Sequence, residues 1–282
     1  MNPAAAAGMR GAASRRALRM PVGAQSRLLH RVRLLLLLGA LLPAPAAAAD
    51  PPRRSGYRDM GAATQAMQRD DAANPAMLSV LAGEALWREP APGGRPACVD
   101  CHGEPGRLRG VATRYPGFDA RTGTALNLDG RINACRQVHQ QAPAWSWESA
   151  PLLALSALIG LQSRGLPIAP PADERLAAAR ERGRMRFETR IGQLDLACAD
   201  CHDRLAGRSL GGTPIPQGHP TGYPLYRLQW QALGSLQRRL RNCMTGVRAQ
   251  PYPAGSAELI ELELHLFQRA EGMPQETPAV RP

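Results

Sequence analysis

The sequence is poor in aromatic residues, which make up 4% of its 282 positions, and its arginines are not interleaved with them. Nucleic-acid-binding proteins place basic and stacking side chains together, so the formal net charge of +12 does not indicate nucleic-acid binding. Alternating β-branched residues are scarce too, which predicts a mainly helical fold. Beyond residue 49 no apolar run is long enough to cross a bilayer, so we expect no membrane span there.

The stretch 1–33 lacks acidic side chains and contains seven arginines. An apolar run from Leu34 to Leu42 follows, and an alanine triplet ends at Ala49 before Asp50. This order predicts a secretory signal peptide over residues 1–49 and a mature protein in the bacterial periplasm. An uncleaved anchor is the alternative. Cleavage near Ala49 removes all seven arginines and lowers the net charge to about +5.

The pentapeptide Cys-X-X-Cys-His occurs twice, at Cys98–His102 and Cys198–His202. It is typical of c-type haem attachment, because two thiols form thioethers with the haem vinyl groups and the histidine supplies an axial iron ligand. Zinc sites and redox disulfides also use a Cys-X-X-Cys pair. Two copies ending in histidine, behind an export signal, predict two covalently bound c-type haems. The attachment residues are Cys98, Cys101, Cys198 and Cys201, and the proximal iron ligands are His102 and His202.

The sequence around these motifs is repeated. Gly83–Trp87 precedes the first motif and Gly183–Phe187 precedes the second, at an offset of 100. After the motifs the offset becomes 108. It then relates Tyr115-Pro116, Arg131 and Cys135 to Tyr223-Pro224, Arg239 and Cys243. Such internal self-similarity indicates a duplicated structural unit.

Each unit is predicted to contain a helix, a haem motif, a long loop, a helix with a cysteine and a closing helix. This is the layout of a class I cytochrome c, so we expect a tandem repeat of two class I cytochrome c-like domains over residues 50–170 and 171–282. The Pro/Ala-rich stretch Pro167–Pro171 is the predicted linker, and a helix is expected over Ala172–Phe187.

Methionine is absent between Met77 and Met185, so the first haem lacks the axial methionine that electron carriers commonly use. Cys135 and His139 are the candidates for its sixth iron ligand. They lie four residues apart and therefore share a helix face with Leu128 and Ile132.

The second unit offers Met244 and Met273, but Cys243 holds the place equivalent to Cys135. Cys243 continues the apolar stripe of Leu233, Leu236 and Leu240, which predicts that it faces the interior. Arg131 and Arg239 each precede a cysteine by one turn, and a nearby cation lowers the pKa of a thiol. An axial thiolate, a disulfide between the two cysteines and simple core packing remain open.

The run Arg239–Tyr252 resembles the C-terminal signature of the SoxA family, the dihaem cytochrome subunits of the bacterial thiosulfate-oxidising Sox system. Gly255-Ser256 and the ending Glu276–Arg281 are similar to the family as well. Upstream, Gly83–Trp87 and Ile132–Arg136 also fit. The resemblance runs from about residue 55 to the end, and the chain keeps both attachment motifs although some family members have lost the first.

The resemblance implies an L-cysteine S-thiosulfotransferase that joins thiosulfate oxidatively to a cysteine of a SoxYZ-like carrier protein, with electrons leaving through haem. It implies a heterodimer with a SoxX-like monohaem cytochrome c. It further implies that Cys135 is the axial ligand of the first haem. Cys243 would be the axial ligand of the second haem and the catalytic cysteine, and Arg239 an active-site arginine. Arg269 matches the family more loosely and is left out of the catalytic set.

Two other functions compete with this interpretation. A non-catalytic periplasmic dihaem electron-transfer cytochrome would favour Met244 or Met273 as the axial ligand. A dihaem peroxidase needs an open haem position, against which the two matched cysteines argue. His219 and His265 are interpreted as surface or core residues, and the loop Gly211–Pro220 could cover the second haem.

Overall fold

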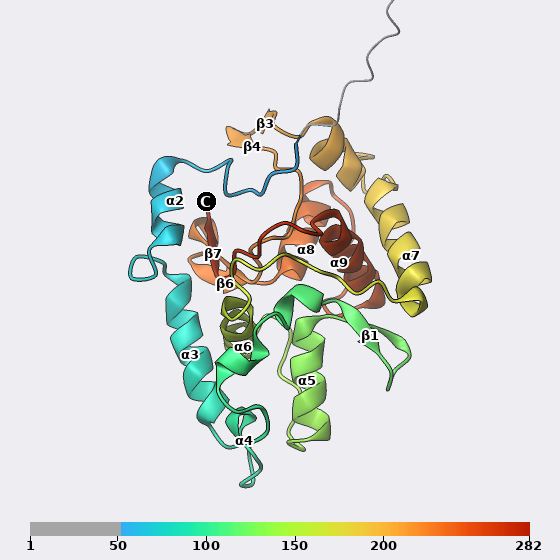
Figure 1. Ribbon diagram of the computed structural model, residues 1–282. Coiled ribbons are helices and arrows are strands. Elements are labelled where there is room, and N and C mark those ends of the chain that lie inside the picture. The colour runs from blue at the N-terminus through green and yellow to red at the C-terminus, as the bar shows by residue number, and fades with distance from the viewer. Residues whose placement is uncertain (1–51) are drawn as a thin grey trace, which may run out of the picture. The chain divides into compact units, whose positions relative to one another are not determined.

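The computed structural model describes residues 52–282, of which Arg53–Pro282 form one compact unit (Figure 1). The predicted signal peptide lies outside the described residues. Within them the fold is mainly helical, as expected, and no helix there is long and apolar enough to cross a membrane. The helices are α2 (Ala62–Arg69), α3 (Ala76–Arg88), α4 (Cys98–His102), α5 (Leu128–Val138), α6 (Ala150–Leu161), α7 (Ala177–Glu188), α8 (Leu236–Gly246) and α9 (Ala257–Arg269).

Short turns and strands connect these helices. The 3-10 turns are η1 (Pro105–Leu108), η2 (Ala112–Arg114), η3 (Glu174–Leu176) and η5 (Leu228–Trp230), and η4 (Asp200–Arg204) is a π-helical turn. The strands are β1 (Gly117–Asp119), β2 (Thr124–Leu126), β3 (Ser209–Leu210), β4 (Thr213–Pro214), β5 (Leu225–Arg227), β6 (Ala232–Gly234) and β7 (Ala279–Arg281).

In the first half of the unit (residues 53–170), α3 packs against α6, which is buried from Leu152 to Gly160. Glycine makes this close contact possible. A Cβ atom on Gly83 would lie 2.4 Å from the carbonyl oxygen of Ala154, well inside van der Waals contact. The helix before the first haem motif is therefore fixed against the closing helix backbone to backbone.

The second half (residues 171–282) repeats this contact between α7 and α9. A Cβ atom on Gly183 would lie 2.0 Å from the carbonyl oxygen of Glu261. The two glycines are the ones that the offset of 100 relates in the sequence. Both halves thus use the same small residue where the first and last helices meet.

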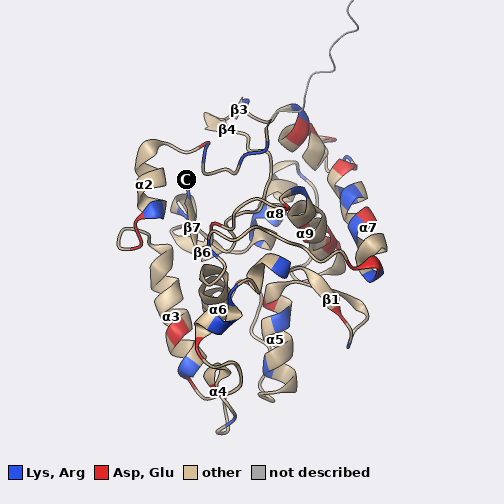
Figure 2. Cartoon of the chain, in the orientation of Figure 1, with Lys and Arg blue, Asp and Glu red and all other residues tan. Residues whose placement is uncertain are grey.

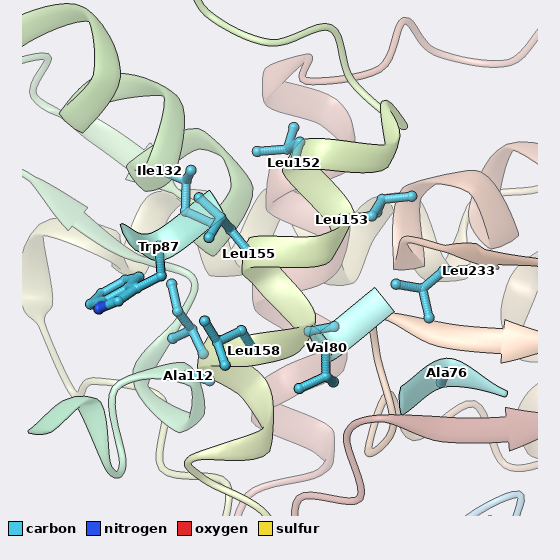
Figure 3. Close-up of a cluster of buried hydrophobic side chains, with 12 residues drawn as sticks. Ala76, Val80, Trp87, Ala112, Ile132, Leu152, Leu153, Leu155, Leu158 and Leu233 are labelled. Atoms are coloured by element: carbon cyan, nitrogen blue, oxygen red, sulfur yellow. The ribbon is translucent and has the colours of Figure 1, made fainter. Parts of the chain in front are cut away.

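The main hydrophobic core lies in the first half and is drawn in Figure 3. Leu152, Leu155 and Leu158 of α6 belong to this cluster together with Val80 and Trp87 of α3. A smaller cluster in the second half joins α7, α8 and α9 through Phe187, Leu236, Leu259, Leu262 and Leu266. Each attachment peptide contributes its first cysteine to the edge of one cluster.

Each cysteine-bearing helix follows a two-stranded antiparallel hairpin. In the first half β1 pairs with β2 and Asn127 caps α5, its side chain accepting a hydrogen bond from the Gly130 amide. In the second half β5 pairs with β6 and Ser235 caps α8 by accepting from the Arg238 amide. Strands, cap and helix start all follow the second repeat offset, the one that relates Cys135 to Cys243. The caps satisfy helix amides that would otherwise lack a partner.

The N-terminal segment (residues 53–75) packs against the other end of the chain. Arg54 donates its backbone amide to the Gln217 side chain at 2.8 Å, and Asn74 donates to the carbonyl of Pro278 at 3.0 Å. Strand β7 adds in parallel to β5, so the last residues join the sheet beside α8. The first half is therefore held in part by contacts with residues of the second half.

The stretch Pro167–Pro171, the predicted linker between the two halves, is packed in place, because Ile168 is buried and exchanges backbone hydrogen bonds with Met273 and Gly272. Two other local expectations are wrong. The helix expected from Ala172 begins at Ala177, since Asp173 accepts from the Arg175 amide and starts the 3-10 turn η3 first. Leu233 lies in strand β6, so the apolar stripe of α8 starts at Leu236.

Candidate functional site

The first attachment peptide forms helix α4. Asp100 accepts a hydrogen bond from the Ala97 amide at 2.8 Å and thereby caps the helix. Cys98 is partly buried against the core, while Cys101 and His102 are exposed. The indole N–H of Trp87 donates to the carbonyl of Gly103 at 2.9 Å and holds the peptide against α3.

The second attachment peptide is held in the same way and is more enclosed. Asp200 accepts from the Ala197 amide at 3.0 Å, and both Cys201 and His202 are partly buried. The Nδ1 atom of His202 lies 2.8 Å from the carbonyl oxygen of Pro216. Because a carbonyl only accepts, Nδ1 carries the proton and Nε2 is unprotonated, as a metal ligand must be. The loop Gly211–Pro220 therefore covers the second motif through Pro216.

Cys243 of α8 lies near His202 in the second site, close enough for the imidazole to lower the pKa of the thiol. Burial, the largest influence, raises the pKa of Cys243. The contact with His202 and the charges of Arg239 and Arg227 outweigh burial and leave this pKa below its ordinary value. The structure thus brings together three predicted residues, His202, Cys243 and Arg239.

Cys135 of α5 lies beside the first attachment peptide. Burial and then the proximity of Cys135 raise the pKa of Cys98 to about 11. Burial also raises the pKa of Cys135, followed by the effect of Cys101, although the charge of Arg131 opposes both. His139, the other candidate ligand, is exposed at the C-terminal end of α5. The structure therefore places Cys135 near the first motif.

All six cysteines have free thiols, so Cys135 and Cys243 do not form a disulfide. The donor atoms in each half fit a c-type haem, because two thiols and one imidazole are joined by a further sulfur close to the attachment peptide. In the second half Nε2 is the unprotonated nitrogen of His202, and Cys243 lies near the same imidazole, so that these two side chains could hold one iron.

The alternative methionine ligands lie elsewhere. Met244 is buried on the wall of a cavity of about 430 Å³ between residues 191–193 and the end of α8. Met273 packs against Ile168 and Ala270. His202 therefore meets Cys243 rather than either methionine.

The surroundings of the two cysteine helices differ in charge. Helix α8 carries three arginines and no acidic residue (Figure 2). Tyr223 lies near Arg239 and Cys243, and burial raises the pKa of its phenol to about 12. Arg227, at the end of β5, also lies near Cys243 and Arg239. Sequence reasoning missed Arg227, because the repeat offset pairs it with Asp119 and no local pattern places it beside Arg239.

Three further residues noted in the sequence make packing or ion-pair contacts within the second half. Arg269 forms an ion pair with Asp203 at 2.6 Å and stacks over Phe187. His219 is partly buried near Arg269, and burial lowers its pKa to about 4. The ring of His265 lies 5.2 Å from that of Phe187. These residues pack around the second half without meeting Cys243.

Comparison with known proteins agrees with this arrangement. The family model described as SoxA/TsdA, cytochrome c domain, matches residues 82–168. The L-cysteine S-thiosulfotransferase subunit SoxA of Rhodovulum sulfidophilum is 35% identical, over 81% of this chain and 80% of the relative. The subunit of the same name from Pseudaminobacter salicylatoxidans is 33% identical, over 80% of each chain.

A solved structure is similar as well. The crystal structure of SoxXA from P. pantotrophus superposes with a TM-score of 0.79 at 32% identity, covering 82% of this chain and 87% of that chain. The cytochrome c fold and the haem-type donor atoms are accounted for by this relationship. The chain belongs to the SoxA family of L-cysteine S-thiosulfotransferase subunits.

Proposed function

We propose that this chain is the dihaem SoxA-type subunit of an L-cysteine S-thiosulfotransferase, built from two class I cytochrome c-like domains at residues 50–170 and 171–282. Three matched features support the tandem arrangement. Gly83 and Gly183 occupy the same helix contact, the two attachment peptides have the same aspartate cap, and the hairpin and cysteine helix of the first half recur in the second.

A cytochrome c domain implies c-type haem, and the proposal is that two haems are bound covalently. The attachment residues are Cys98, Cys101, Cys198 and Cys201. The axial pairs are His102 with Cys135 and His202 with Cys243. The contact between Cys243 and His202, and the proximity of Cys135 to Cys98, support these pairs.

The partners follow from the relatives. The P. pantotrophus structure is that of a SoxXA complex, which supports a SoxX-like monohaem cytochrome c as the second subunit. The name of the relatives supports thiosulfate as the sulfur donor and a carrier cysteine, of SoxYZ type, as the acceptor. The leader predicted over residues 1–49 supports a periplasmic location.

The reaction joins two sulfur atoms. The carrier thiolate and the terminal sulfur of thiosulfate form one sulfur–sulfur bond, two electrons leave, and a proton is released if the carrier begins as a thiol. One haem accepts a single electron, so the two electrons would leave in two successive one-electron transfers through haem to the cytochrome partner. Arg239 binds the sulfonate oxygens through its fork of N–H groups, and Tyr223 keeps its proton at neutral pH and can donate to an oxyanion. Cys243 presents a sulfur at the place where the new bond forms.

The contact of Cys243 with His202, beside Arg239, carries the proposal. We expect Cys243→Ser to abolish thiosulfate-dependent haem reduction in the complex with its cytochrome partner and carrier protein, while intact mass still shows two haems. Cys135→Ser is the matched variant in the first half, and we expect it to retain turnover. If Cys243→Ser reduces haem at the parent rate, the chain is an electron carrier instead.

A further inference from the structure

The two halves treat the arginine before their cysteine differently. In the first half Arg131 donates to Asp119 at 3.0 Å, and the side chain of Asp119 is only 4% exposed. Asp119 is held in place by Thr122, which donates to its other oxygen. The positive charge of Arg131 is thus neutralised by a buried carboxylate of its own chain.

In the second half the position of Asp119 is occupied by Arg227. Asp119 is the last residue of β1 and pairs with Thr124, and Arg227 is the last residue of β5 and pairs with Ala232. The two strand pairs are related by the same repeat offset as Arg131 and Arg239. A carboxylate beside an arginine in one half therefore becomes a second arginine in the other.

Arg227 is partly buried, and the charges of Arg239, Tyr223 and Cys243 act on it. Its guanidinium donates to Gln229 and lies 5.4 Å from the ring centre of Trp230. Over residues 52–282 neither Arg227 nor Arg239 forms an ion pair with a carboxylate. The neighbouring Arg281 is paired with Glu276 at 2.5 Å.

Two guanidinium groups close together, without a carboxylate between them, repel each other. Burial lowers the pKa of Arg227, and repulsion by the charge of Arg239 lowers it further. A bound dianion would remove it, because each guanidinium would gain a charge-assisted partner. The second half is therefore suited to a doubly charged anion, and the first half is not.

We infer that Arg227 is a second substrate-binding residue, which together with Arg239 holds the sulfonate end of thiosulfate beside Cys243. The inference rests on the proposed function, since it assigns the substrate of that site to two arginines. It also explains why the first half would not bind thiosulfate, because Asp119 already fills the anion position there and would repel it. A selective preference for dianions over monoanions follows from the paired charges.

The test is thiosulfate binding by the haem-loaded complex with its cytochrome partner, measured calorimetrically at constant ionic strength. We expect Arg227→Gln to weaken the Kd by ~10- to 100-fold, the effect of losing one charge-assisted partner. Arg227→Lys should recover part of the affinity because it restores the charge. Arg227→Gln should weaken binding of the monoanion methanethiosulfonate less than it weakens binding of thiosulfate.

Arg121→Gln is the control for charge alone. Arg121 is exposed on the β1–β2 turn of the first half, so its removal lowers the net charge equally and should leave the thiosulfate Kd unchanged. Potentiometric titration of both haems in each variant provides a second measurement, independent of turnover.

An unchanged thiosulfate Kd in Arg227→Gln would overturn the inference. So would a shifted potential of the second haem with an unchanged Kd, since Arg227 would then pair with a haem propionate. If Arg239→Ala weakens binding and Arg227→Gln does not, the proposed function stands and this inference alone fails. A parent complex that neither binds nor turns over thiosulfate would refute both.

Discussion

The two halves share the same order of hairpin and cysteine-bearing helix, and they differ in the surroundings of the motif histidine and of the helix cysteine. His102 is exposed, whereas His202 is partly buried and hydrogen-bonded to Pro216. The pKa of Cys135 is raised mainly by burial, whereas that of Cys243 is lowered because its contact with His202 and nearby arginines outweigh burial. A few side chains around a matching hairpin and helix therefore shift the pKa values of the two cysteines in opposite directions.

The difference lies in the neighbours of the cysteine rather than in the cysteine itself. Both halves provide a thiol at the same helical position after the same hairpin. Only the second half combines it with a fixed imidazole tautomer and with cations that lack carboxylate partners among the described residues. The two halves thus place their cysteines at matching positions, and the charges around those cysteines differ.

The largest loss of stability is expected when a single methyl group is added at the glycine contact between the first and last helices of each half. We expect Gly183→Ala to lower the free energy of unfolding by ~2–3 kcal/mol and Gly83→Ala by somewhat less. The added Cβ would lie 2.0 Å and 2.4 Å, respectively, from a backbone carbonyl oxygen that cannot rotate away.

Denaturant unfolding of the haem-loaded protein, followed by circular dichroism, measures both changes. Gly246→Ala is the control, because a Cβ there meets nothing within 4 Å and alanine favours a helix. Equal stability of Gly183→Ala and the parent would show that the helices can separate freely, contrary to the close contact.

A smaller effect on stability is expected at a buried carboxylate, which lies on the cysteine-bearing helix in the first half and on the closing helix in the second. In the first half Ser156 of α6 donates to Asp129, whereas in the second half Glu263 of α9 contacts Gln237 and accepts from Asn127 at 2.9 Å. Burial raises the pKa of Asp129 to about 6 and that of Glu263 to about 8.

The unfolded chain releases the Glu263 proton above its ordinary pKa of 4.5, but the folded protein keeps it until about pH 8. Stability is therefore lost as the pH rises through this window. At pH 6 Asp129 has released only about half of its proton, so it adds a small part of the loss between pH 6 and 8 and Glu263 provides the larger part. We expect Glu263→Gln to reduce that loss by ~1–3 kcal/mol.

Chemical unfolding at pH 6 and pH 8 gives the required difference for parent and variant. Exposed Glu271→Gln serves as the control and should follow the parent curve. A parent whose stability is constant from pH 6 to 8 contradicts the buried, protonated state of Glu263.

The smallest predicted effect makes the first half more like the second. Trp87 donates its indole N–H to Gly103, and the equivalent residue of the second half, Phe187, has no donor. We expect Trp87→Phe to cost about 1 kcal/mol of unfolding free energy, the usual net value of one hydrogen bond. The same unfolding assay measures it, and a variant as stable as the parent would show that this bond adds nothing.

The sequence predicted what its repeat and motifs encode locally. The two repeat offsets relate Gly83 to Gly183 and Cys135 to Cys243, and the structure sets both pairs in matching positions. Helix content followed from composition. These features depend on residues near one another in the chain, so a pattern suffices to find them.

Contacts between distant residues could not be predicted in this way. The bond from His202 to Pro216 depends on the path of an irregular loop, and the pairing of β7 with β5 joins segments that lie far apart in the chain. Arg227 lies near Cys243 and Arg239 only in the folded protein, where β5 is beside α8. Local periodicity in the sequence gives no information on contacts of this kind.

The attachment of the N-terminal segment to the end of the chain also has a temporal consequence. Ribosomes make residues 53–75 first and residues 276–281 last, yet Asn74 bonds Pro278 and the Gln68 side chain accepts from the Val280 amide. The segment made first cannot reach its place until synthesis is complete. Both Cys-X-X-Cys-His segments therefore leave the ribosome before this contact can form, so the joining of the two chain ends is a late step of folding.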